Sequence, residues 1–160
     1  MKKLFILIII VVGFQQVYSQ NVSEKDSLEI SEKINDWNKA WKIKDANLAA
    51  KWYSDNADFT NAFGFSMIGK NEIEPYLTRV FGFDFVMAGN SQQTSLKFKK
   101  LSINSILVIT TIERKGQKTS DGNELGTRNT THYRIFQKND SWKIIAHLIS
   151  DARSIETEKH

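Results

Sequence analysis

The spacing of apolar residues changes once along this chain, from the period of a helix to the period of a strand. Four apolar residues follow steps of four, three and four, namely Ile30, Ile34, Trp37 and Trp41. This stripe predicts an amphipathic helix over about residues 23–43. From Asp58 the period becomes two, because Phe59, Asn61 and Phe63 alternate with their neighbours, as in a strand. The chain is therefore expected to place helices before a sheet.

Capping and turn residues divide the rest of the chain. Ser23 with Asp26 resembles a capping box at the start of the first helix. Asp45 can cap a second, shorter helix that ends near Tyr53, and Gly64 allows a hairpin turn. We expect hairpin strands at 58–63 and 65–68, a third helix at 71–81, and long strands at about 92–103, 105–114, 126–137 and 142–152. The polar segment 116–125 is predicted to be a long, mobile hairpin loop.

The first 19 residues have the pattern of a cleavable secretory signal peptide. Two lysines precede the apolar stretch Leu4–Val12, and Val17 and Ser19 suit the positions before a cleavage site. The mature chain is then expected to begin at Gln20, secreted or periplasmic and free of the membrane, which N-terminal sequencing of exported protein would test. An uncleaved anchor is the alternative, but a bilayer span needs about 20 apolar residues. A signal with two basic residues and a short apolar stretch looks bacterial.

Length and composition favour a single domain without covalent crosslinks. Removing residues 1–19 from the 160 leaves 141, which suits one domain over 20–160 with one core. Loss of Lys2 and Lys3 lowers the basic residues from 22 to 20 against 18 acidic ones, so the net charge falls from +4 to +2. This near neutrality gives no reason to expect a nucleic-acid partner. The chain has no cysteine, which excludes disulfides, thiolate chemistry and a lipid-anchor cysteine.

Four local segments and the order of the elements resemble a known superfamily. The segments are the Trp37–Trp41 helix, "DANLAAKWYSDNADFTNAFG" at 45–64, "GKNEI" at 69–73 and "SWKIIAHLIS" at 141–150. Helix, helix, short hairpin, helix and four long antiparallel strands is the order of the nuclear transport factor 2-like superfamily, which includes ketosteroid isomerase, scytalone dehydratase and the SnoaL-like polyketide cyclases. The chain resembles the small, secreted SnoaL-like branch over about residues 25–152.

The resemblance implies an α+β fold, a cystatin-like roll in which a cone-shaped, strongly curved antiparallel sheet wraps around three N-terminal helices. An apolar pocket opens at one end of such a cone, and members use it either for catalysis or for binding alone. By this match Asn61 stands where the isomerases carry their catalytic aspartate. An amide cannot act as that base, although it can orient a carbonyl or hydroxyl. Equally, Asn61 can be an asparagine satisfied by neighbouring backbone.

Aromatic residues supply most of the predicted ligand contacts. The default reading of the aromatic residues on the first two helices is core packing, but Tyr53, at a helix end, has a hydroxyl that needs a partner. The predicted ligand-binding residues are Trp41, Tyr53, Phe59, Asn61, Phe63, Tyr133 and Trp142.

Two histidines in the sheet are the candidate catalytic residues. If the last hairpin is symmetric about Asn139 and Asp140, His132 faces His147 across the strands. Their face also carries Arg134, Phe136, Lys143, Ile145 and Ile149. The opposite face carries Thr131, Tyr133, Ile135, Trp142, Ile144, Ala146 and Leu148, and we expect this more apolar set inside the cone. The histidines would then lie on the convex side, where relatives often form dimers, and we expect a homodimer through this face because Phe136, Ile145 and Ile149 would otherwise be exposed together. A bulge would reverse the facing from its position onward.

Three functional hypotheses follow from this pattern. The preferred one is a binding domain, without catalysis or with weak catalysis, whose cone takes a small, largely apolar molecule. The rival is an isomerase, cyclase or dehydratase that uses His147 or His132 as a base, with Asn61 and Tyr53 polarising a carbonyl. The third is a homodimeric interaction domain with a filled pocket. No cofactor is predicted, and two histidines without a third ligand do not predict a metal site.

Overall fold

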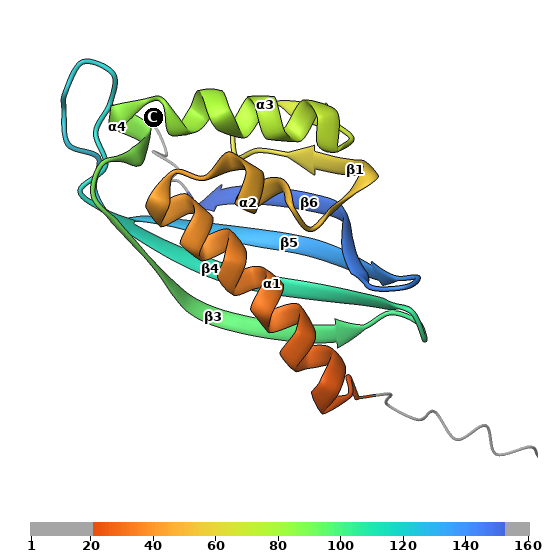
Figure 1. The fold of residues 1–160 in the computed structure, drawn as a ribbon. Helices are drawn as coiled ribbons and strands as arrows, with labels where there is room; N and C mark the ends of the chain where they lie inside the picture. Colours follow the sequence, from red (N-terminus) through yellow and green to blue (C-terminus); the bar gives the residue numbers. More distant parts are fainter. Residues whose placement is uncertain (1–20, 153–160) are drawn as a thin grey trace, which may run out of the picture.

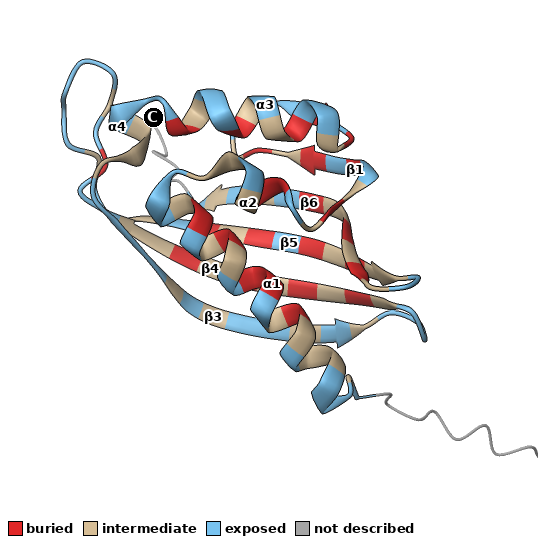
Figure 2. Ribbon diagram, in the orientation of Figure 1, coloured by how far each residue is buried: buried red, intermediate tan, exposed pale blue. Residues whose placement is uncertain are grey.

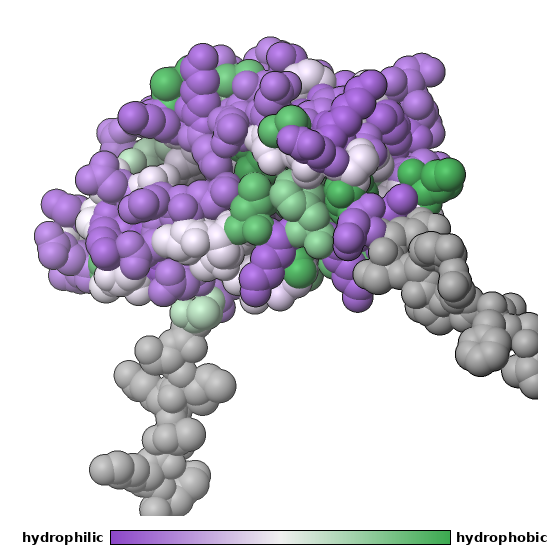
Figure 3. Space-filling view, turned by 90° about the horizontal axis from the view of Figure 1, so that it is seen from below, coloured by the Kyte–Doolittle hydropathy of each residue, from purple (hydrophilic) through white to green (hydrophobic). Residues whose placement is uncertain are grey.

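The computed structural model describes residues 21–152 of the chain. The predicted signal peptide and the cleavage site after Ser19 lie outside the described residues. None of the helices between residues 21 and 152 is long and apolar enough to cross a membrane. Viewed from below, the surface is mostly hydrophilic, with hydrophobic residues gathered near the middle of this face (Figure 3).

Helices cover one face of a curved six-stranded sheet (Figure 1). The helices are α1 (Glu24–Ile43), α2 (Ala46–Ala50), α3 (Lys70–Phe81) and α4 (Asp84–Met87). The strands are β1 (Tyr53–Thr60), β2 (Ser66–Ile68), β3 (Asn90–Lys100), β4 (Ser105–Lys115), β5 (Arg128–Lys138) and β6 (Trp142–Ala152). The strand order is β2-β1-β6-β5-β4-β3, and β1 runs parallel to β6 while the other neighbours are antiparallel. The predicted α+β class and the order of the predicted elements are confirmed.

The start of α1 is held both by its own cap and by the sheet. Ser23 accepts a hydrogen bond from the backbone N–H of Asp26 at 3.1 Å, so the predicted capping interaction is present. The Asp26 carboxylate also accepts from the Lys138 ammonium at 2.8 Å and from the Trp142 indole at 2.9 Å. These bonds hold the pKa of Asp26 well below its usual value. One carboxylate therefore joins the helix N-terminus to the β5–β6 hairpin.

Three elements differ from the sequence prediction: the second helix, the first strand and a short helix after the third. The helix predicted to end near Tyr53 already ends at Ala50, and Tyr53 begins β1 with its side chain buried. The first strand therefore begins five residues before the predicted start at Asp58. It ends at Thr60, so that Asn61 begins a turn rather than lying within the strand. The short helix α4 was not predicted, because four residues are too few to show a helical period.

A bulge in β6 decides which residues face the helices. Lys138 pairs with Trp142, Phe136 with Ile144, and Ile135 with Ala146, so Ile145 is an extra residue in the ladder. Inward-facing residues are even-numbered before Ile145 and odd-numbered after it. As a result Trp142, Ile144, His147 and Ile149 all face the helices, and Figure 2 shows buried positions along the inner strands.

The predicted position of the histidines on the convex face is wrong. His132, Arg134, Phe136 and His147 are buried on the face that the helices cover. The predicted inward position of Tyr133 and Leu148 is also wrong, because their side chains are 40% and 49% exposed. The two histidines are diagonal neighbours rather than direct partners, since His132 pairs with Ile149 and His147 with Arg134. The assumed symmetric hairpin had missed both the register and the bulge.

Candidate functional site

A small cavity of about 80 Å³ lies where α3 and the turn after β1 meet β4, β5 and β6. We call it the inner cavity. Its apolar walls include Trp41, Phe59, Leu77, Val80, Val86 and Ile149. Its polar lining includes Asn61, Tyr76, Arg114, Thr130 and His132. The cavity thus combines an apolar body with a few polar groups, which is the usual make-up of a small-molecule site.

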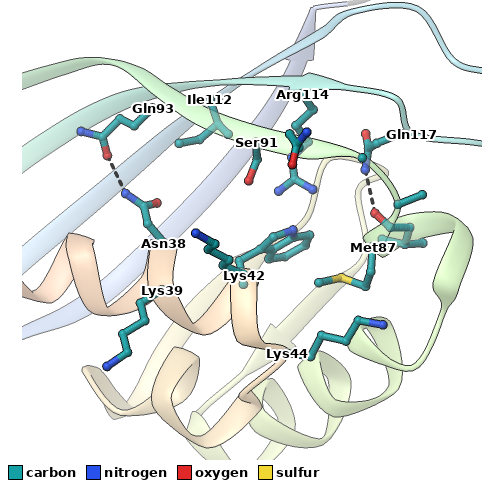
Figure 4. A pocket seen from close by; sticks show the side chains of 15 residues that line it. Asn38, Lys39, Lys42, Lys44, Met87, Ser91, Gln93, Ile112, Arg114 and Gln117 are labelled. Carbon is teal, nitrogen blue, oxygen red and sulfur yellow. Dashed lines mark hydrogen bonds between the residues drawn. The ribbon is translucent and has the colours of Figure 1, made fainter.

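A larger hollow of about 560 Å³ adjoins the inner cavity. We call it the outer groove; it lies between the C-terminal half of α1, the α4–β3 connection and the end of β4 (Figure 4). Four residues line both spaces, namely Trp41, Val86, Arg114 and Gln117. The two spaces therefore share one wall, formed by these four residues. At Gly89, which lines the groove, the backbone passes close to the end of β4: an added Cβ would lie 2.0 Å from the Lys115 carbonyl oxygen, and φ is +77°.

A buried hydrogen-bond network lies beneath the inner cavity. The Tyr53 hydroxyl is 2.5 Å from His147 Nδ1, and His147 Nε2 is 3.0 Å from His132 Nδ1. His132 Nδ1 is also 3.0 Å from an Arg134 nitrogen, and His132 Nε2 is 3.3 Å from the Thr130 hydroxyl. Trp37 of α1 covers the pair, with its ring centroid 5.2 Å from that of His147. The network links the core to Thr130 at the cavity.

Arg134 determines where the protons of this network lie. A guanidinium only donates, so His132 Nδ1 must be an acceptor and His132 carries its proton on Nε2. His147 Nε2 must then donate to His132 Nδ1, which leaves His147 Nδ1 to accept from Tyr53. Each of the four ring nitrogens is occupied, and no histidine lone pair remains directed at the cavity.

The electrostatics of the network keep both histidines neutral. Burial and the charge of Arg134 hold the pKa values of His132 and His147 well below the usual value of 6.5. Burial also raises the pKa of Tyr53 above its usual value, so the phenol keeps its proton. Arg134 is fully buried, donates to Thr110 at 2.9 Å, and has no carboxylate partner among residues 21–152. Burial lowers the pKa of Arg134 to about 10, which leaves it charged at neutral pH.

The side chain of Asn61 forms hydrogen bonds within the turn after β1. Its side-chain oxygen accepts from the backbone N–H groups of Phe63 at 2.8 Å and Phe65 at 3.0 Å. Its amide nitrogen donates to the Tyr76 hydroxyl at 2.5 Å. Of the two readings of Asn61 left open by the sequence, the geometry favours an asparagine satisfied by local backbone. The Tyr76 hydroxyl, which accepts from Asn61, keeps its own proton for donation.

The predicted ligand-binding residues divide into three groups. Trp41, Phe59, Asn61 and Phe63 line the inner cavity together with His132, although Phe63 is 64% exposed at the rim. Tyr53 and His147 lie beneath it, bonded to each other. Tyr133 is on the outer face of the sheet, and Trp142 is at the other end of β5 and β6, bonded to Asp26. Ligand contact by the first group stays a prediction.

Five polar residues at the cavity were missed by sequence reasoning, namely Tyr76, Arg114, Gln117, Arg128 and Thr130. Tyr76 stands three residues after Ile73 and four before Val80 on α3, so helical spacing could have indicated it. Arg114 shares the face of Ile112 by strand alternation, but a charged residue near a strand end is ordinarily read as solvated. No motif or spacing in the sequence indicated that Thr130 would line a cavity. Within the described residues no group of three or more histidine, aspartate or glutamate side chains could hold a metal ion.

The arrangement of layers and sheet defines the class of protein. The chain has the cystatin-like, nuclear transport factor 2-like fold. A structure with a cystatin-like fold from Caulobacter vibrioides is similar at a TM-score of 0.72 and 14% identity, covering 81% of this chain and 91% of the other. An NTF-2-like protein of unknown function from Shewanella oneidensis MR-1 is similar at 0.62 and 17%, covering 78% and 98%.

A candidate scytalone dehydratase from Novosphingobium aromaticivorans is similar at a TM-score of 0.64 and 11% identity, covering 85% of this chain and 90% of the other. No protein-family model and no curated protein matches the chain. At these identities the likeness shows the shared fold and does not transfer an activity.

Proposed function

We propose that this domain binds a small, largely apolar molecule in the inner cavity. The observation that carries the proposal is the lining, which combines aromatic and aliphatic walls with Tyr76, whose hydroxyl accepts from Asn61 and has a proton to donate. A ligand with one hydrogen-bond acceptor on an apolar body would satisfy both features. The cavity volume of about 80 Å³ suits a single ring or a short aliphatic group, and the outer groove extends the available space.

The protonation pattern supports binding over base catalysis by a histidine. A general base must present a lone pair within hydrogen-bond reach of the proton it removes. The lone pair of His132 is on Nδ1, which already accepts from Arg134 and His147. The Nε2 atom, which carries the proton, is bonded to Thr130. A pKa held well below 6.5 by burial and Arg134 also makes His132 a weak base.

Toluene, a neutral molecule with one ring, tests the proposal. We expect saturable shifts of backbone amide resonances around Tyr76 and Thr130 when toluene is added. Val80→Phe should remove these shifts, because Val80 lines the cavity and a larger side chain would fill it. Thr78→Phe adds the same ring on the exposed side of α3 and should leave them intact. Absence of saturable shifts in the unmodified protein would refute the proposal.

A second proposed role is self-association through the outer face of the sheet. Tyr133 and Leu148 are direct register partners there and are both exposed. Large apolar side chains that sit together on a sheet surface are typical of an interface. The sequence had predicted a dimer through Phe136, Ile145 and Ile149, but Phe136 is buried beneath the helices and Ile149 lines the cavity. The proposed interface therefore involves different residues.

A further inference from the structure

Arg114 is a partly buried cation where the two spaces meet. It lies on the inward face at the end of β4, with its guanidinium carbon 4.1 Å from the centroid of the Trp41 ring. Its Nε atom is buried, and no described residue accepts a hydrogen bond from it. Burial and the neighbouring charge of Arg128 lower the pKa of Arg114 to about 10, against the opposing effect of the Asp151 carboxylate, so Arg114 stays charged at neutral pH. A hydrogen-bond acceptor on a bound ligand would stabilise a half-buried guanidinium of this kind.

The outer groove adds positive charge and no negative charge to this position. Lys39, Lys42 and Lys44 line it together with Arg114, and no aspartate or glutamate does. Lys44 pairs with Asp84 at 3.2 Å, whereas Lys42 has no ion-pair partner among residues 21–152. In Figure 4 the ends of Lys39 and Lys44 point away from β3 and β4, while Arg114 reaches toward α1.

The acidic residues near Arg114 are already paired with other cations. Asp151 binds Arg128 at 2.7 Å, and Glu113 binds Lys115 at 2.8 Å. Arg128 also donates to Gln117 at 2.9 Å, and Gln117 donates in turn to the Val86 carbonyl. These bonds hold the wall of the groove. Asp151 also acts electrostatically on Arg114, but it is shared with Arg128, so these three groups together carry a net positive charge.

We propose that the ligand is an amphipathic carboxylate, with its apolar ring in the inner cavity and its carboxylate on Arg114. This inference rests on the proposed function, because it assigns a second half to the same ligand. A planar guanidinium matches a carboxylate with two parallel hydrogen bonds, and Lys42 adds attraction from α1. Trp41, which lines both spaces, would contact the linker between ring and carboxylate.

Comparing 4-phenylbutyrate with 4-phenylbutanamide tests the role of the carboxylate separately from that of the apolar ring, because both molecules carry the same ring and linker. Calorimetric titration of the full chain should show the carboxylate binding about tenfold or more tightly than the neutral amide, as expected for a charge-assisted hydrogen bond. Arg114→Met should remove this preference, so that the two probes bind with affinities within about twofold of each other. Arg114→Lys keeps the charge and should retain part of the preference.

Lys39→Met is the matched control, because it removes one positive charge from the same groove on a side chain that points away from Arg114. It should leave the preference unchanged. Equal binding of the two probes to the unmodified protein would overturn the inference and leave the proposed function standing. A preference that survives Arg114→Met would also overturn it. Failure of both probes and of toluene to bind would count against the proposed function itself.

Discussion

At the scale of single residues, the buried histidines couple the stability of the fold to pH. His132 and His147 are uncharged in the folded protein at neutral pH, because burial and Arg134 lower their pKa values well below 6.5. In the unfolded chain both take up protons near pH 6.5. Below that pH the unfolded state therefore binds more protons than the folded state, and stability must fall as pH falls.

We expect the free energy of unfolding to fall by about 2 to 3 kcal/mol between pH 7.5 and 5.5, since each histidine contributes up to about 1.4 kcal/mol per pH unit below 6.5. Urea denaturation at several pH values measures this. His132→Gln should reduce the pH dependence by roughly half, because one titrating group is lost. A free energy of unfolding that stays constant across this range would show that the histidines are not buried neutral as described.

Asn61 shows why the identity of a residue at a matched position does not determine its role. Its side chain forms hydrogen bonds with the backbone N–H groups of Phe63 and Phe65 in the turn and with the Tyr76 hydroxyl on α3. The sequence indicated correctly that an amide stands there and cannot act as a base. Its bonds to backbone depend on how the turn closes after Thr60, which alternation along the strand did not reveal.

At the scale of elements, the junction between α1 and the β5–β6 hairpin depends on Asp26. Its carboxylate accepts from Lys138 and Trp142, two residues more than 100 positions away in the chain. Trp142 is buried, so loss of its acceptor leaves an indole N–H without a partner. The start of the first helix and the end of the sheet should therefore lose stability together when this carboxylate is removed.

Asp26→Ala should lower the free energy of unfolding by about 2 kcal/mol, from the lost hydrogen bonds and the unsatisfied indole. Asp26→Asn keeps an acceptor and should cost about half as much. Glu24→Ala, which removes an exposed acid from the same helical turn, is the control and should cost only a few tenths of a kcal/mol. Chemical denaturation measures all three, and equal losses for Asp26→Ala and Glu24→Ala would contradict the described junction.

At the scale of the whole molecule, the outer face of the sheet is the surface for the proposed self-association. Leu148→Asp places a charge opposite Tyr133 on this face, so we expect it to shift sedimentation at micromolar concentration from dimer to monomer. Thr78→Asp, on the exposed side of α3, should leave the dimer intact. An unmodified protein that already sediments as a monomer at tens of micromolar would rule out the association.

The sequence by itself determined the fold class, the order of the helices and long strands, and the cap of α1. These features depend on local spacing, on turn residues and on side chains a few positions apart, all of which are visible along one segment of chain. The resemblance to the superfamily, rather than local spacing, led to the assignment of Trp41, Phe59 and Asn61 to a pocket, and these residues do line the inner cavity.

Only the tertiary structure decided which way the last strand faces and which polar groups reach the cavity. One extra residue at Ile145 reverses the facing of β6, and the pairing with β5 that accommodates it joins segments far apart in sequence. That reversal brings His147 inward beneath Trp37 and His132, and strand register places Arg114 over Trp41 from α1. The spacing of residues within one segment does not determine its register or its packing against distant segments. The histidine network and the position of Arg114 between the two spaces could therefore be seen only in the folded structure.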